Sequence, residues 1–135
     1  MSNPTEGITI GAEATLEQQV TFETTIASLR EDLPPVFATP AMIMLMENTA
    51  AKAIHSLLPK GWISVGTLVN VQHLAPAPLG SIVKSIARVT AVDALIITFE
   101  VTVKDATETI GSGIHQRAAI DVERFMKRIR NKQNS

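Results

Sequence analysis

The sequence predicts an α+β fold in which one long helix packs on one face of a curved antiparallel sheet of five strands. Residues 39–58 form a single long, mostly apolar helical stretch, with one strand-like run before it and four after it. The links between the last three runs, such as "VDA" and "DAT", are short, which favours antiparallel neighbours. At 135 residues, we expect one domain, 1–135, with a small core.

The expected strands are rich in branched apolar residues, which favour extended backbone. They cover residues 14–22, 62–78, 81–92, 94–105 and 108–122. From about residue 123 the chain is strongly basic, and this last part is expected to be either a short helix or a flexible tail.

The long helix has recognisable ends. Thr39 offers a hydroxyl as N-cap, and Pro40 suits the first helical position. Pro59 and Gly61 discourage continuation, so the helix is expected to run to about Leu58.

The composition excludes several classes of function. A net charge of −1 gives no overall field toward nucleic acid or an anionic membrane, and no apolar run approaches the ~20 residues that span a bilayer. The absence of cysteine excludes disulfides, thiolate metal sites and a cysteine nucleophile. No spacing of histidine and carboxylate residues indicates a metal site. The first residues, "MSNPTEG", lack the features of a signal peptide, so we expect a cytoplasmic protein.

Glu47 is the residue of the helix that most needs an explanation. At 100° per residue, it lies far from the polar stripe that contains Asn48, Lys52 and His55. It projects instead from the apolar face, where an isolated ionised carboxylate would cost several kcal/mol. Glu47 therefore needs a partner or a wet cavity.

His73 is the first candidate partner. Strict alternation along the next strand places it on the odd-numbered face with Val69 and Val71, and that face is expected to meet the helix. With the hydroxyl of Thr39 nearby, Glu47 and His73 supply the groups needed for hydrolysis. The pattern alone also allows a purely structural pair.

A second histidine, His115, shares one strand face with Arg117. One interpretation of this face is a solvated edge, and the other is that Arg117 contacts an anion.

Three stretches together resemble the hotdog-fold thioesterases, in particular the fluoroacetyl-CoA thioesterase branch. They are "VFATPAMIMLME", "VGTLVNVQHLAPAPLG" and "IGSGIHQRAAI", and the similarity runs from about Pro35 to Lys127. The resemblance implies a long helix wrapped by a five-stranded sheet, a homodimer, which could pair further into a tetramer, and hydrolysis of an acyl-CoA thioester. No separate cofactor is implied, because CoA is part of the substrate.

The resemblance also implies roles for single residues. Thr39, Glu47 and His73 match the catalytic threonine, glutamate and histidine of the family, while Gly66 and Arg117 match residues of the substrate site. The phenylalanines that the fluoroacetyl enzyme carries in a lid are missing from "IASLREDLPP", so the acyl group of the substrate stays open.

Several alternatives remain at this stage. Glu47 could attack the thioester directly or act as a base for water or Thr39, with His73 transferring protons. A hotdog-fold enoyl-CoA hydratase or dehydratase would use a similar pair of residues, and a non-catalytic binder of acyl-CoA or another apolar ligand would share the fold. The hydroxyl of Thr39, eight residues before Glu47, favours the thioesterase.

Overall fold

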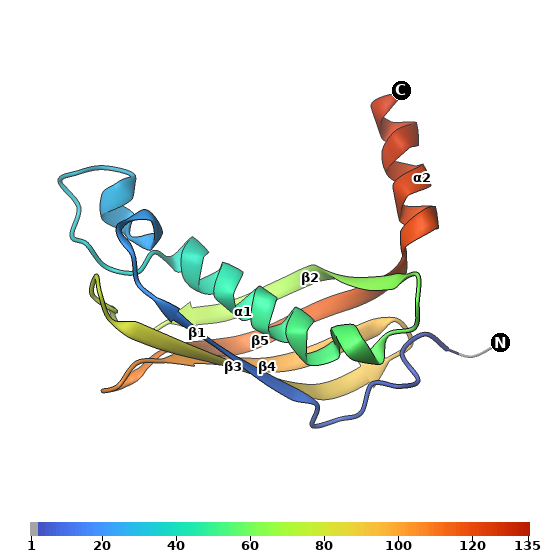
Figure 1. Ribbon diagram of the computed structural model, residues 1–135, viewed down its shortest axis with the longest axis horizontal. Coiled ribbons are helices and arrows are strands. Elements are labelled where there is room, and N and C mark those ends of the chain that lie inside the picture. Colours follow the sequence, from blue (N-terminus) through green and yellow to red (C-terminus); the bar gives the residue numbers. More distant parts are fainter. Residues whose placement is uncertain (1–2) are drawn as a thin grey trace.

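A computed structural model describes residues 3–135, and it contains the predicted sheet (Figure 1). Its five strands form one antiparallel sheet in the order β1-β3-β4-β5-β2. The strands are β1 (Glu13–Gln19), β2 (Trp62–His73), β3 (Ile82–Asp93), β4 (Ile96–Lys104) and β5 (Thr109–Asp121). The second strand ends at His73, five residues before the predicted end, since the prolines at 76 and 78 cannot donate to a strand ladder. The last three strands are neighbours in the sheet, as their short links predict.

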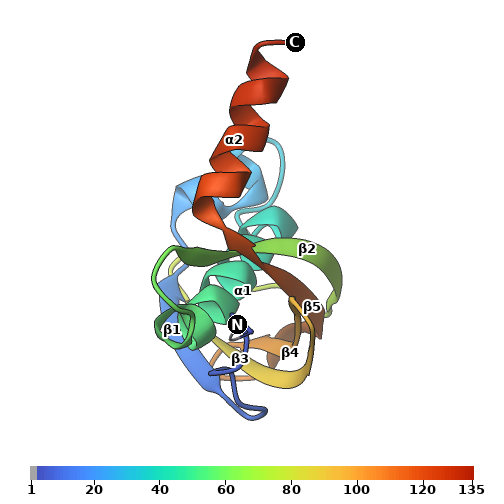
Figure 2. The same cartoon turned by 90° about the vertical axis from the view of Figure 1, so that its right-hand side faces the viewer.

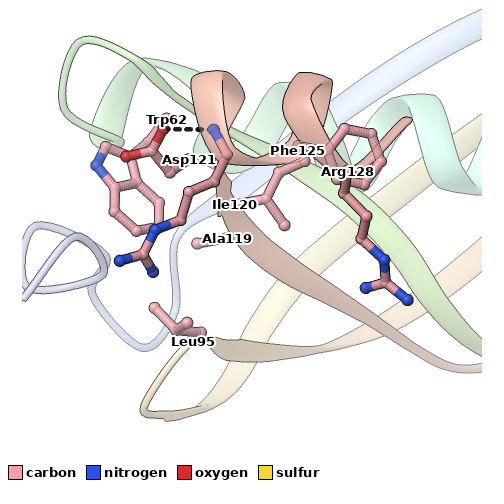
Figure 3. Close-up of a pocket in the computed structure, with 8 residues that line it drawn as sticks. Trp62, Leu95, Ala119, Ile120, Asp121, Phe125 and Arg128 are labelled. Atoms are coloured by element: carbon pink, nitrogen blue, oxygen red, sulfur yellow. Dashed lines mark hydrogen bonds between the residues drawn. The ribbon is translucent and has the colours of Figure 1, made fainter. Parts of the chain in front are cut away.

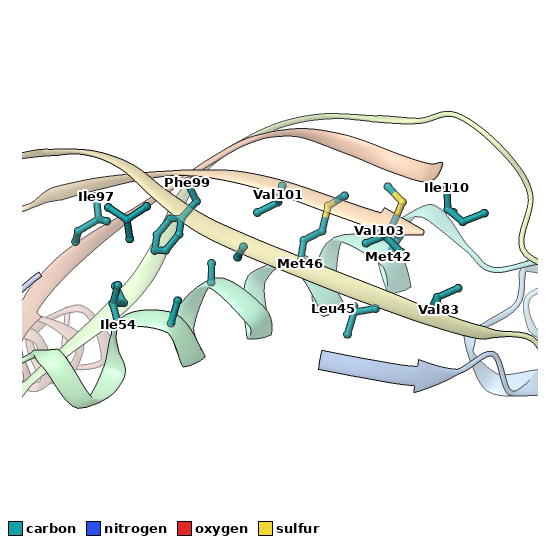
Figure 4. Close-up of a cluster of buried hydrophobic side chains, with 14 of the residues drawn as sticks. Met42, Leu45, Met46, Ile54, Val83, Ile97, Phe99, Val101, Val103 and Ile110 are labelled. Atoms are coloured by element: carbon teal, nitrogen blue, oxygen red, sulfur yellow. The ribbon is translucent and has the colours of Figure 1, made fainter. Parts of the chain in front are cut away.

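Helix α1 (Thr39–Ile54) lies in the concave face of the sheet and continues into a single 3₁₀ turn, His55–Leu57 (Figure 2). Its inner face meets the inner side chains of the central strands to form the core (Figure 4). The largest fully buried side chains there include Met42, Met46 and Phe99. Burying a side chain of this size contributes roughly 1.5–3 kcal/mol, so the helix and the sheet hold each other in place.

The start of α1 differs from the prediction. The residue in the N-cap position is Ala38, which has extended backbone angles and no side-chain cap, and Thr39 is already the first helical residue. The predicted N-cap role of Thr39 is therefore wrong. Because a residue inside the first turn points its side chain outward from the helix, the Thr39 hydroxyl is available to a neighbouring element.

Strand β2 is an edge strand, and it contains a bulge. The pairing between β2 and β5 shifts between Gly66 and Leu68, so Thr67 is left out of the ladder. As a result Gly66 pairs with Arg117 while Val69 pairs with His115, and both partners point into the core. Strict alternation along β2 predicts that Gly66 and His73 lie on opposite faces of the sheet. This prediction is wrong, because the additional residue in the bulge, Thr67, places Gly66 on the inner face as well.

Helix α2 (Val122–Gln133) projects away from the sheet at the end of β5 (Figure 2). The Asp121 side chain caps it by accepting hydrogen bonds from the backbone N–H groups of Glu123 and Arg124. No side chain of α2 is buried. Of the two predicted forms of this basic segment, the helix is correct. None of the helices in residues 3–135 is long and apolar enough to cross a membrane.

Candidate active site

Thr39 and His73 form the first pair of the site. The Thr39 Oγ1 atom lies 2.8 Å from His73 Nδ1, within hydrogen-bond distance. The helix start and the end of β2 bring them together, although they are 34 residues apart in sequence. The other ring nitrogen of His73, Nε2, is buried and has no hydrogen-bond partner within residues 3–135. A buried polar atom without a partner is rare in proteins, so Nε2 marks His73 as a candidate functional residue.

Glu47 belongs to a second pair, with Arg117. Its Oε2 atom lies 3.7 Å from Arg117 Nη1, and its side chain is 37% exposed. The carboxylate also lies against Gly66, where a β-carbon would collide with Oε2. Because Gly66 has no side chain, it leaves room for the carboxylate in this position. The predicted partner of Glu47 is present, and it is the guanidinium of Arg117.

Arg117 is almost fully buried and is held from several sides. Its Nε atom donates to Ser64 Oγ at 2.8 Å, and Nη2 donates to the Ser64 carbonyl at 3.0 Å. Burial lowers the pKa of Arg117, and the charge of Glu47 opposes that change. A guanidinium remains protonated in proteins in spite of such shifts, so Arg117 places a fixed positive charge beside the Glu47 carboxylate.

His115 completes this network, and its contacts define its protonation. Its Nδ1 atom lies 2.9 Å from the Leu68 carbonyl, and its Nε2 atom lies 3.2 Å from Arg117 Nη1. A carbonyl only accepts and a guanidinium only donates, so Nδ1 carries the hydrogen and Nε2 accepts. Burial is the main reason why the pKa of His115 is lowered; the Leu68 hydrogen bond opposes this, and the Arg117 charge adds to it. His115 is therefore a neutral acceptor for Arg117.

The solvated-edge interpretation of His115 and Arg117 is wrong. Strand β5 lies between β4 and β2, so its inner face is covered by the core, and His115 is 1% exposed. Its ring stacks on Phe99 with the ring centroids 6.0 Å apart. The sequence does not identify β5 as an internal strand, and for this reason the network of His115, Arg117 and Ser64 could not be predicted from it.

Within one chain the predicted residues form two pairs and not one cluster. Thr39 and Glu47 are eight residues apart, or about 12 Å along the helix axis. No hydrogen bond or ion pair in the described part of the chain joins Glu47 to Thr39 or His73. Both pairs lie beside the edge strand β2, whose residues 66–70 are all exposed.

Residues 20–123 match the family model of the fluoroacetyl-CoA-specific thioesterase. The fluoroacetyl-CoA thioesterase of Streptantibioticus cattleyicolor is 37% identical over 101 residues, which are 75% of this chain and 73% of that protein. The chain belongs to the fluoroacetyl-CoA thioesterase family. This membership confirms the prediction, made from the three sequence stretches, that the protein is an acyl-CoA thioesterase.

Solved structures give the same result for the fold. A structure of the fluoroacetyl-CoA thioesterase superposes with a TM-score of 0.87 at 32% identity, covering 94% of this chain and 98% of the other. A hot-dog-like protein from Thermanaerovibrio acidaminovorans superposes with a TM-score of 0.89 at 23% identity, covering 97% of each chain. The predicted hotdog fold is therefore confirmed.

Proposed function

We propose that this protein hydrolyses acyl-CoA thioesters, giving a carboxylic acid and free CoA, at a site shared by two subunits. Family membership supports the reaction. The observation that carries the assignment to particular residues is the Thr39–His73 pair at 2.8 Å, with His73 Nε2 buried and unpartnered beside it. A general acid and base needs such a free ring nitrogen facing the substrate.

The exposed edge of β2 supports a homodimer. Residues 66–70 are exposed, and Leu68 and Val69 at their centre are each 43% exposed. An apolar edge with open backbone groups invites antiparallel pairing with a second copy. Symmetric pairing centred on Leu68 would set Gly66 opposite the partner's Asn70, by simple counting along two antiparallel strands.

This pairing would join the two half-sites. Within one chain His73 is seven positions from Gly66, which is roughly 23 Å along the strand. Across the proposed interface, the partner's His73 would lie opposite Ile63, only three positions from Gly66 and about 10 Å along the strand. Glu47 of one subunit would then face the Thr39–His73 pair of the other, with the thioester carbonyl between them.

The chemistry follows from these positions. Glu47, at the edge of an apolar core, either attacks the carbonyl carbon, giving a mixed anhydride that water then cleaves to release the acid and free Glu47, or removes a proton from the attacking water. His73 Nε2 delivers a proton to the departing CoA sulfur, and Thr39 holds the imidazole in position through Nδ1. The free N–H groups in the first turn of α1 stabilise the oxyanion. Arg117, at 3.7 Å, holds the Glu47 carboxylate in place.

The test is incubation with a panel of acyl-CoA thioesters, from fluoroacetyl-CoA and acetyl-CoA to longer chains, with a thiol reagent that detects free CoA. We expect release of CoA, and its loss in Glu47→Gln, which keeps the size of the side chain and removes its charge. A change in enoyl absorbance without free CoA would mean a hydratase. Thermal stabilisation by acyl-CoA without any reaction would mean a binding protein.

The acyl group is proposed to differ from that of the fluoroacetyl enzyme. The segment before α1 carries no phenylalanine between residues 26 and 35. Leu29 in this segment is 76% exposed. Without lid phenylalanines, this segment gives a small fluorinated acyl group no special enclosure. We expect fluoroacetyl-CoA to be no better a substrate than acetyl-CoA, and a strong preference for it in the panel would contradict this.

A further inference from the structure

Helix α2 is amphipathic, and most of it stands away from its own chain. Its first two turns border a hollow of about 380 Å³, which Arg124, Phe125 and Arg128 line from the helix side (Figure 3). Beyond Arg128 the helix projects from the sheet (Figure 1), and none of its side chains is buried. Its apolar residues share one stripe at helical spacing, and they are Val122, Phe125, Met126 and Ile129. An apolar stripe on a projecting helix indicates that something covers it.

A second exposed surface is formed by residues 22–36, which precede α1 and are called the 22–36 segment below. Phe22 and Leu29 in this segment are exposed although they are large and apolar. Ile26 and Val36 line the hollow beside the proposed catalytic pair. The segment thus covers one wall of the active site on its inner side and leaves apolar surface open on its outer side.

The charges of the two surfaces are opposite. Helix α2 carries five basic residues and one acidic residue, a net charge of +4, whereas the 22–36 segment carries three acidic residues and one basic residue, a net charge of −2. Within residues 3–135 the only salt bridge that involves either surface joins Arg30 and Asp32 of the segment. Glu23 and Glu31 are exposed. Complementary charge of this kind orients two surfaces toward each other.

Within one chain the two surfaces do not meet. They lie at opposite ends of β2 (Figure 1), whose 12 residues span roughly 36 Å. Both project to the same side of the molecule (Figures 1 and 2). A contact between α2 and the 22–36 segment therefore requires a second copy of the chain.

The proposed β2 pairing supplies that second copy in a suitable place. Pairing centred on Leu68 sets Trp62 opposite the partner's Leu74, by counting along the two strands. Asp121, the N-cap of α2, pairs with Trp62 in its own sheet, so α2 begins about two strand spacings, or roughly 10 Å, from the partner's Leu74. Leu74 lines the same hollow as the 22–36 segment.

The direction and the length of α2 also fit. A two-fold axis that relates neighbouring antiparallel strands is perpendicular to their sheet, so the projecting parts of both subunits lie on the same side. With 12 residues, α2 is about 18 Å long. It is therefore long enough to lie along the partner's 22–36 segment.

We propose that α2 of each subunit packs on the 22–36 segment of the other subunit and holds it over the active-site hollow. This inference rests on the shared-site dimer of the proposed function, but it concerns a contact away from the reacting groups. It makes the order of the 22–36 segment dependent on the partner's helix.

Photo-crosslinking tests the contact directly. The chain has no cysteine, so one introduced thiol can carry a benzophenone label. Met126→Cys places the label on the apolar stripe of α2, and Glu13→Cys places it on β1, the opposite edge of the sheet, as a control. We expect the label at 126 to give a covalent dimer whose attachment site, located by mass spectrometry, lies in the 22–36 segment. The label at 13 should give no covalent dimer.

The same experiment separates this inference from the proposed function. A dimer in light scattering whose label at 126 attaches elsewhere, or not at all, would overturn the contact and leave the thioesterase and its shared site untouched. Monomers in light scattering would overturn the contact and the shared site together. Binding of the parent to vesicles of anionic phospholipid, without attachment to the 22–36 segment, would assign the stripe to a membrane surface and overturn the proposal.

Hydrogen exchange tests the consequence for the 22–36 segment. Met126→Asp/Ile129→Asp disrupts the apolar stripe, and Glu123→Gln/Lys127→Gln changes the far side of α2 without changing its net charge. Both variants should stay folded, because no side chain of α2 is buried. We expect amides of the 22–36 segment to exchange about ten-fold faster in the first variant, since local opening becomes easier, and at the parent rate in the second. An unchanged rate in Met126→Asp/Ile129→Asp would overturn the proposal, and the measurement needs no substrate.

Discussion

Replacing His115 distinguishes a residue that positions Arg117 from one that only fills the core. His115 uses its two ring nitrogens differently: Nδ1 donates to the Leu68 carbonyl, and Nε2 accepts from Arg117. Asparagine at this position can reproduce the Nδ1 donor but offers no acceptor toward Arg117. Glutamine is longer, and its carbonyl oxygen can reproduce the Nε2 acceptor.

The magnitudes follow from these contacts. Both variants lose the stacking on Phe99, which is worth about 0.5–1.5 kcal/mol. Only His115→Asn also leaves a buried N–H of Arg117 without an acceptor, at a cost of roughly 1–3 kcal/mol unless Arg117 moves. A shift of Arg117 would displace Glu47, its neighbour at 3.7 Å. We therefore expect His115→Asn to lower kcat by about ten-fold or more, equivalent to ~1.4 kcal/mol, and His115→Gln to keep kcat close to the parent.

The assay is kcat and KM for the best thioester of the panel, with thermal unfolding of each variant as the control for stability. A lower kcat in His115→Asn than in His115→Gln, with both variants folded at the assay temperature, would support positioning through Arg117. Equal kcat values in the two variants would refute the reasoning, because His115 would then act only through its volume.

The other predictions concern the two half-sites, the interface and pH. Thr39→Ser should stay folded and active. Thr39→Ala should lose turnover by about ten-fold, while its stability falls by only about 0.5–1.5 kcal/mol, because the hydroxyl caps nothing and makes one hydrogen bond, to His73; an unchanged turnover would contradict this. In Gly66→Ala the added β-carbon would collide with Glu47 Oε2, the movable end of that side chain, so the carboxylate must shift and kcat should fall while the fold survives. An unchanged kcat would show that the reaction does not need the carboxylate in its place beside Gly66. Light scattering at micromolar concentration should give the mass of a dimer. Leu68→Lys should give inactive monomers, because two lysines would lie opposite each other at the two-fold axis and repel. Active monomers would refute the shared site. Because the pKa of His115 is lowered by burial, its contribution to stability is present above its ordinary pKa of about 6.5 and is lost as the pH falls through its folded value. His115 faces Arg117 on its own strand and Glu47 on α1. The free energy of unfolding, measured with urea, should therefore fall more steeply with decreasing pH in the parent than in His115→Gln. Identical pH profiles would show that another group is responsible.

The sequence by itself determined the features that depend on local periodicity. Glu47 is on the inner side of α1 because 3.6 residues per turn place it there whatever the rest of the chain does. The five strands and their antiparallel order at β3, β4 and β5 follow from β-rich runs joined by short links. Thr39, Glu47 and His73 lie in stretches that resemble the hotdog-fold thioesterases, and the family match confirms this resemblance.

The tertiary structure decided which groups meet. A bulge at Thr67 returns Gly66 to the inner face, and no local pattern predicts a bulge, since it depends on how two strands are paired. The same holds for the Thr39 hydroxyl, which contacts His73 from a distant strand instead of capping its own helix. His115 and Arg117 are buried because β5 is internal, and β2 is exposed because it is an edge. Strand order is a long-range property of the chain, so the polar network around Glu47 and the open edge beside it could be found only in the folded molecule.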